Sequence, residues 1–212
     1  MVELTDLEDK HEGETVWVLG SGSTMNYIDA SFFRDKITVA TNIIANVKGF
    51  TADYTFSHYH RVTKEVFNPD TIHVTLLRDT ESHQPWEGEV PENVVFAEQV
   101  SYQPPGSAWN PLSTHPPLRG SLVYGSSSLH GSMHLAAHLG ASFIILIGAD
   151  CGTLDGEHRT EGYRVGHNPW GLYNRHHKLL KDYLQQEYPV KIHSLNPFIN
   201  FNLEGHKFEG VS

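Results

Sequence analysis

The 212-residue chain has a single cysteine, Cys151, and few basic residues. One cysteine excludes an internal disulfide, which favours a reducing, cytoplasmic location. No run of about 20 apolar residues occurs and no charged-then-apolar leader opens the chain, so we expect neither a membrane-spanning segment nor a signal peptide. Lysine and arginine number 15 against 25 acidic residues, and the net charge of −10 disfavours bulk attraction to nucleic acids or anionic membranes.

Histidine, in contrast, is abundant, with 15 copies. The pair His58 and His60 and the series His130, His134 and His138 invite a metal hypothesis. No carboxylate or cysteine joins the series at ligand spacing, so we predict no metal site there and favour a solvated or supporting helix face.

The pattern of apolar runs predicts one α/β domain over residues 15–212, preceded by a flexible, polar arm over 1–14. Strands are expected at 16–19, 37–41, 53–57, 71–77, 94–97, 142–150 and 190–195, and helices at 25–33, 61–67, 126–139 and 169–188. Five prolines make 101–124 irregular, and the glycine-rich stretch 151–167 is expected to form a lid. Right-handed crossovers then give a mostly parallel, doubly wound sheet with helices on both faces.

A glycine- and serine-rich loop, residues 20–24, follows the first strand directly. Glycines there would let backbone N–H groups approach a phosphate, so Gly20, Ser21, Gly22 and Ser23 form a candidate nucleotide cradle. The alternative is a strand-to-helix turn without a ligand. Met25 stands where a dinucleotide fingerprint has its third glycine, which disfavours nicotinamide binding.

Other polar residues are predicted at the same edge of the sheet, because the carboxyl ends of parallel strands lie together. This set comprises Asn42, His58, Ser126, Ser127, Ser128, Gly148, Asp150 and Asn196. Asp150 has three open interpretations: a Mg²⁺ ligand together with Asp155 and Glu157, a partner of a sugar hydroxyl, or a cap for a loop N–H.

These motifs carry a resemblance to known proteins. The chain resembles the bacterial sialyltransferases of the Campylobacter type in four features: the loop 20–24, Asn42, the segment 126–141 leading into 144–150, and His167. They also resemble the related MptE-like group, which includes motility accessory proteins and archaeal 6-hydroxymethylpterin diphosphokinases. The likeness extends in order over about residues 15–197 and singles out neither subgroup.

The sialyltransferase likeness implies a Rossmann-like domain that moves a sugar from a CMP-linked donor to a glycan or other hydroxyl acceptor. Gly20, Ser21 and Gly22 would then hold the nucleotide phosphate region, and Asn42 the nucleotide or the donor sugar. Ser126 and Ser127 would bind the donor carboxylate or phosphate. His167 would be the general base, a role that suits a side chain with an ordinary pKa of ~6.5.

The sequence departs from this pattern in the lid. Tyr163 and Tyr173 do not match the spacing of the tyrosines expected to stabilise the leaving phosphate. The diphosphokinase likeness implies instead ATP with Mg²⁺ held by Asp150 and Asp155, although the first loop has no lysine or arginine. A non-catalytic nucleotide- or glycan-binding module is the third interpretation, and the sequence leaves a homo-oligomer open.

Overall fold

The computed structural model describes residues 2–101, 121–124, 127–150, 159–162 and 170–195. The strands are β1 (Thr15–Leu19), β2 (Ile37–Thr41), β3 (Tyr54–Ser57), β4 (Ile72–Leu76), β5 (Val94–Ser101), β6 (Ser121–Tyr124), β7 (Phe143–Ile147) and β8 (Lys191–Ser194). The helices are α1 (Ile44–Lys48), α2 (His60–Glu65), α3 (Ser128–His138) and α4 (Trp170–Glu187), with 3-10 turns η1 (Leu4–Leu7), η2 (Ser23–Tyr27) and η3 (Ala30–Phe33).

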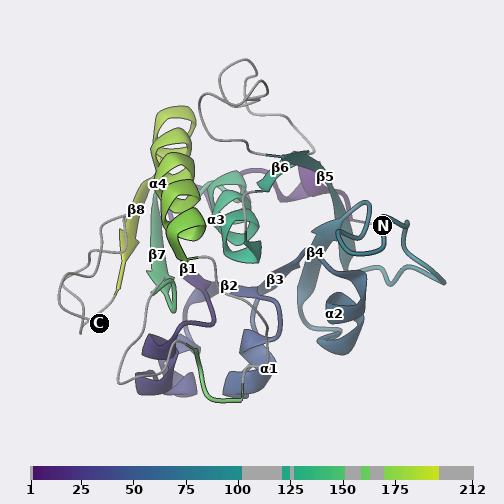
Figure 1. Ribbon diagram of the computed structural model, residues 1–212, viewed down its shortest axis with the longest axis horizontal. Coiled ribbons are helices and arrows are strands. Elements are labelled where there is room, and N and C mark those ends of the chain that lie inside the picture. Colours follow the sequence, from purple (N-terminus) through teal and green to yellow (C-terminus); the bar gives the residue numbers. More distant parts are fainter. Residues whose placement is uncertain (1, 102–120, 125–126, 151–158, 163–169, 196–212) are drawn as a thin grey trace.

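All eight of these strands lie in one sheet, in the order β6-β5-β4-β3-β2-β1-β7-β8. Every pairing between them is parallel, which confirms the predicted α/β, Rossmann-like fold. The chain steps outward from β1 to β6 and then returns to β7 on the other side of β1. Right-handed crossovers in opposite directions place helices on opposite faces, and Figure 1 shows α3 and α4 on one side of the sheet and α1 on the other.

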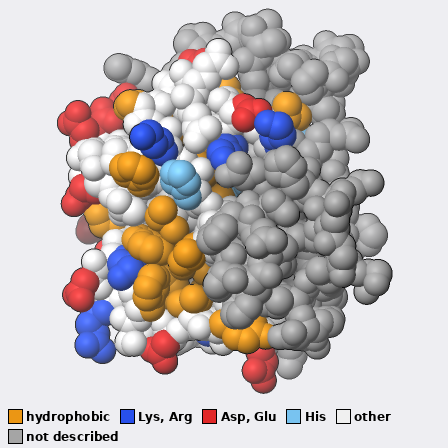
Figure 2. All heavy atoms as spheres, turned by 90° about the vertical axis from the view of Figure 1, so that its left-hand side faces the viewer, with side chains coloured by type: hydrophobic (Ala, Val, Ile, Leu, Met, Phe, Trp, Pro, Cys, Tyr) orange, Lys and Arg blue, Asp and Glu red, His pale blue; other side chains and the backbone are white. Residues whose placement is uncertain are grey.

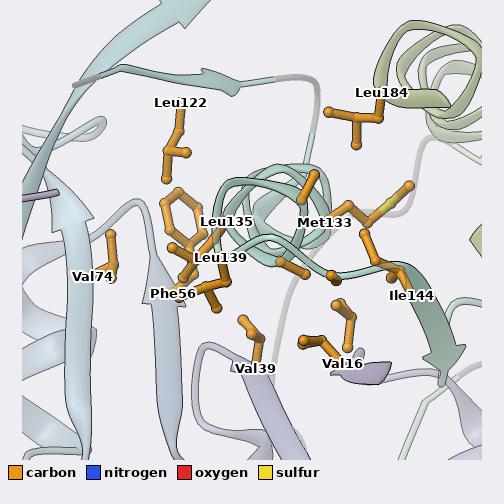
Figure 3. Packing of buried hydrophobic residues seen from close by; sticks show 14 of the residues in the cluster. Val16, Val39, Phe56, Val74, Leu122, Met133, Leu135, Leu139, Ile144 and Leu184 are labelled. Atoms are coloured by element: carbon orange, nitrogen blue, oxygen red, sulfur yellow. The ribbon is translucent and has the colours of Figure 1, made fainter. Parts of the chain in front are cut away.

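The strands alternate between two hydrophobic clusters, one on each face of the sheet. Val16 and Val18 of β1 pack towards α3, whereas Leu19 packs with Met25 and Ile44 on the other face. Figure 3 shows α3 surrounded by side chains from the strands and from α4. Because packing on several sides holds α3 in place, the N-terminus of α3 has a defined position relative to the strand ends.

A glycine allows α3 to lie close to β3. A Cβ on Gly131 would collide with the ring of Phe56, which is completely buried. At the next residue of the helix, Ser132 Oγ lies 2.8 Å from Thr41 Oγ1 of β2. These contacts bring the first turn of α3 against the ends of β2 and β3.

Residues 2–14, which the sequence predicts as a flexible arm, are anchored to the domain. Leu4 and Leu7 are buried in the larger hydrophobic cluster. The N–H groups of Asp9 and His11 donate to the carbonyl oxygens of His138 and Leu139, at 3.0 and 2.7 Å. A segment with two leucines among many polar residues shows no apolar periodicity, and so its docking was not visible in the sequence.

Three other differences from the predicted elements concern short or interrupted segments. The helix expected over 25–33 is two separate 3-10 turns, η2 and η3. Helix α1 was not predicted, and β6 lies inside a stretch predicted to be irregular. A five-residue helix and a four-residue strand are too short for periodicity to distinguish them from loops.

The end of the sheet at β7 and β8 exposes aromatic and basic side chains. Phe143 is 39% exposed and stacks on His193, and Lys191 Nζ lies 5.6 Å from the Phe143 ring centroid. Figure 2 shows hydrophobic side chains gathered on this face beside a histidine. Lysine on an exposed edge strand opposes unwanted pairing with another strand.

Within the described residues, no helix has the length and apolar character needed to cross a bilayer.

Gly131→Ala should destabilise the domain, because the new methyl group meets the Phe56 ring. We expect the free energy of unfolding, measured by urea denaturation, to fall by about 1–3 kcal/mol, the usual range for overpacking. Phe56→Leu in the same chain should offset part of the loss by opening space. Equal effects of Gly131→Ala with and without Phe56→Leu would contradict this packing contact.

Candidate functional site

The predicted site residues that the structure describes lie at one edge of the sheet. Gly20, Asn42, His58 and Gly148 follow β1, β2, β3 and β7, which are consecutive neighbours in the sheet. This edge includes the point between β1 and β7 where the chain reverses its direction of winding, the usual place for a ligand in such sheets.

Helix α3 begins at the same edge. Ser128 Oγ lies 3.3 Å from His58 Nδ1, and Leu129 Cδ1 lies 3.3 Å from where a Cβ on Gly20 would stand. Ser127 is the N-cap of α3, and its hydroxyl accepts a hydrogen bond from the Leu129 N–H at 3.2 Å. The glycine loop and the start of α3 therefore meet, as the sequence predicts.

The glycines of the first loop are explained by contacts between two backbones. A Cβ on Gly20 would collide with the carbonyl of Gly148, and a Cβ on Gly148 would collide with the carbonyl of Gly20. The Gly20 N–H donates to Ile147 O and the Gly22 N–H to Gly148 O, both at 2.7 Å. These two N–H groups already have acceptors in the protein, so the close approach that glycine permits here is between β1 and β7.

Asp150 lies beneath this loop and holds it. Its carboxylate accepts hydrogen bonds from the Thr24 N–H at 2.7 Å, the Thr24 hydroxyl at 2.6 Å and the Ser23 hydroxyl at 3.4 Å. Burial raises the pKa of the carboxyl, and the bonds from Thr24 and Ser23 oppose that rise. Of the three interpretations of Asp150, the geometry matches the cap for a loop N–H.

The four described residues 159–162 also hold the glycine loop, through hydrogen bonds that do not involve Asp150. The Thr160 N–H donates to Ser21 O at 2.8 Å, and its hydroxyl donates to Gly22 O at 2.9 Å. The Glu161 N–H donates to Asn26 Oδ1 at 2.8 Å. Thr160 is buried, and nothing in the sequence near it marked this role because one threonine in a polar stretch has no distinguishing pattern.

Asn42 terminates β2 in a left-handed conformation with φ of 53°. Asparagine tolerates this region better than most residues, and the turn leads the chain away from the sheet into α1. The Asn42 N–H donates to Phe56 O at 2.9 Å, which ties the ends of β2 and β3 together. The residue is partly exposed at the predicted edge.

His58 is buried at the end of β3, with its ring edge-on to Phe56 at 5.3 Å. Burial lowers the pKa of His58 to about 3, so the imidazole is neutral at physiological pH. The Thr80 hydroxyl and N–H both donate to the His58 carbonyl, at 3.1 and 3.2 Å. The side chain is thus held neutral and fixed beside the start of α3.

Several predicted site residues lie outside the described residues: Ser126, Asp155, Glu157, Tyr163, His167 and Asn196. Their predicted roles stay predictions. Among the residues that the structure does describe, no group of three or more histidine, cysteine or acidic side chains has the arrangement of a metal site.

Comparison with known proteins identifies a fold but no family. No protein-family model matches the chain, and no curated protein does. A solved structure of a MAf glycosyltransferase from Magnetospirillum magneticum AMB-1 is similar, with a TM-score of 0.53 and 13% sequence identity. The match covers 89% of this chain and 35% of that protein, so this chain spans about a third of its length. At this identity the likeness establishes a shared glycosyltransferase-like fold.

Asp150→Asn should weaken the attachment of the glycine loop, because the amide NH₂ would face a hydroxyl or N–H donor of Thr24. We expect a loss of about 1–3 kcal/mol in the free energy of unfolding, measured in urea. Thr24→Val should cost a similar amount, whereas Thr24→Ser keeps the hydroxyl and should cost less. Wild-type stability of Asp150→Asn would argue that the carboxylate does not hold the loop.

Acidification from pH 7 to pH 5 should destabilise the fold. Burial lowers the pKa values of His58 and His134 to about 3, whereas unfolded histidines bind protons below ~6.5. The free energy of unfolding is therefore highest above pH ~6.5. It falls as the pH drops from ~6.5 towards 5, by up to about 2 kcal/mol per histidine at pH 5. Urea denaturation at pH 7, 6 and 5 measures the slope, which His134→Gln should reduce. An unchanged slope in that variant would be inconsistent with a buried neutral His134.

Proposed function

We propose that this domain is a glycosyltransferase that takes a sugar from a CMP-linked donor and passes it to a hydroxyl acceptor. The observation that carries the proposal is the meeting of Asn42, His58 and the Ser127–Ser128 turn at the carboxyl edge of the sheet, beside the N-terminus of α3. The fold shared with a MAf glycosyltransferase supports the same reaction class.

The N-terminus of α3 suits the phosphate of such a donor. An eleven-residue helix carries partial positive charge at its N-terminus, where its first N–H groups lack helical acceptors. The chain as a whole carries a net charge of −10, so an anionic donor must be held by local groups of this kind. The donor phosphate therefore binds at Ser127, and the glycine loop supports the site from β1.

The reaction needs a base for the acceptor hydroxyl. The acceptor oxygen forms a bond to the donor sugar carbon, the bond from that carbon to the phosphate oxygen breaks, and the base takes the hydroxyl proton. His58, with a pKa of about 3, is too weak a base for this step near neutral pH. His167 keeps the role that the sequence resemblance implies.

The geometry at Asp150 favours glycosyl transfer over the pyrophosphokinase alternative. That reaction would use Asp150 as a Mg²⁺ ligand across the phosphates of ATP. Both carboxylate oxygens of Asp150 instead accept hydrogen bonds from Thr24, and the side chain is only 2% exposed. Asp150 is therefore assigned to positioning the loop.

A pair of substitutions at the N-cap of α3 tests the donor site. Aspartate and asparagine both cap helices as well as serine does, so Ser127→Asp and Ser127→Asn should both fold. Only Ser127→Asp places a negative charge where the phosphate binds. We expect calorimetry to show CMP affinity at least about tenfold lower in Ser127→Asp and within a few fold of wild type in Ser127→Asn.

The same measurements distinguish the alternatives. Release of CMP from a CMP-linked sugar in the presence of an acceptor would support transfer, and CMP binding without release would favour a binding module. Binding of ATP with Mg²⁺ and a pterin, without binding of CMP, would replace the proposal with the pyrophosphokinase. Equal CMP affinity in both Ser127 variants would show that the phosphate does not bind at the N-terminus of α3.

A further inference from the structure

Helix α3 carries three buried histidines, and two of them connect the helix to neighbouring segments. His138 Nε2 donates to Leu4 O at 2.8 Å, which helps to anchor the N-terminal segment. His134 lies one turn earlier and has two partners. Its Nδ1 lies 2.6 Å from the backbone nitrogen of Val123 in β6, and its Nε2 lies 2.8 Å from the hydroxyl of Tyr188, directly after α4.

The two hydrogen bonds of His134 determine which ring nitrogen carries its proton. A backbone N–H can only donate, so Nδ1 accepts from Val123 and is unprotonated. The proton of the neutral ring is therefore on Nε2, which donates to the Tyr188 hydroxyl. A second proton on Nδ1 would face the Val123 N–H, donor against donor. Protonation of His134 therefore breaks the bond to β6 and is compatible with the bond to Tyr188.

The surroundings of His134 oppose a positive charge on its ring. The residue is 2% exposed, and the rings of Tyr183 and Tyr188 lie edge-on to it at 6.4 and 5.6 Å. Burial, together with the nearby His138, lowers the pKa of His134 to about 3. The described acidic groups of this region act on the Tyr188 hydroxyl: Glu8, Asp9 and Glu187. With β6 in place, the ring of His134 is therefore neutral at pH 5 and above.

Strand β6 is the element that this bond holds. It has four residues and lies at the end of the sheet, so β5 is its one neighbour among the described strands. Short elements at the edge of a fold open locally at a lower free energy than the core does. Two residues separate the end of β6 from Ser127, the N-cap of α3. An opening of β6 therefore also affects the segment that leads into α3.

We propose that His134 is a pH-sensitive latch, through which acid releases β6 from α3 while the centre of the sheet stays folded. In the closed state, the Val123 N–H occupies Nδ1. In the open state, solvent reaches the ring, which then binds a proton below the ordinary histidine pKa of ~6.5. The closed state is therefore most favoured above pH ~6.5 and becomes less favoured as the pH falls below this value. This inference does not depend on the proposed function.

Amide hydrogen exchange of the whole chain, followed by NMR from pH 7.5 to pH 5, tests the latch. The protection factor of the Val123 amide, relative to an unstructured peptide at the same pH, measures the opening of β6. We expect it to be constant above pH ~6.5 and to fall by up to about tenfold per pH unit below this value, as one linked proton requires. The amide of Val18, in the central strand β1, should stay more strongly protected at every pH.

Two substitutions at His134 form a matched pair. Glutamine can accept from the Val123 N–H and donate to the Tyr188 hydroxyl but does not titrate, so His134→Gln should make the Val123 protection factor independent of pH. Leucine removes both bonds, so His134→Leu should lower this protection factor by about tenfold at pH 7, again without pH dependence. His193→Gln, at an exposed histidine of β8, should behave as wild type.

Three results would each overturn the latch. The first is a wild-type protection factor at Val123 that does not change between pH 7 and pH 5. The second is an equal pH dependence in wild type and His134→Gln. The third is equal protection with equal pH dependence at Val123 and Val18, because β6 would then open only when the whole domain unfolds. The first and third need no variant, and none involves a nucleotide, so failure of the donor site would leave the latch standing.

Discussion

The contact between two glycine backbones, where β1 and β7 end, is the constraint on which the rest of this edge depends. Because neither Gly20 nor Gly148 has a Cβ, the carbonyl group of each can occupy the space where a Cβ of the other would stand. This brings Asp150 beneath the loop, where it caps the Thr24 N–H. The loop is thereby held next to the first turn of α3.

This arrangement changes how a glycine-rich loop after a strand is interpreted. Such loops bind phosphate when their backbone N–H groups point into an open crevice. Here the N–H groups of Gly20, Gly22 and Thr24 have acceptors within the protein, and Thr160 covers the outer carbonyls. The glycines serve the joining of strands, and our proposal places the anion of the donor at the start of α3 instead.

The sequence predicted the architecture well where patterns are long. Continuous apolar strands such as 143–147 and the helix beginning at Ser128 were expected close to where they occur. Short elements without periodicity, such as α1, and the docking of Leu4 and Leu7 were not. In those segments, contacts with distant residues decide the structure, and local residue patterns carry little of that information.

The sequence by itself determined that this is a parallel α/β domain whose polar strand ends share one edge, because apolar periodicity and crossover handedness leave few other folds. Only the tertiary structure decided what each polar residue does there. Asp150 holds a loop, and His130 is buried beside three other histidines, and these positions depend on partners up to 127 residues away in the chain.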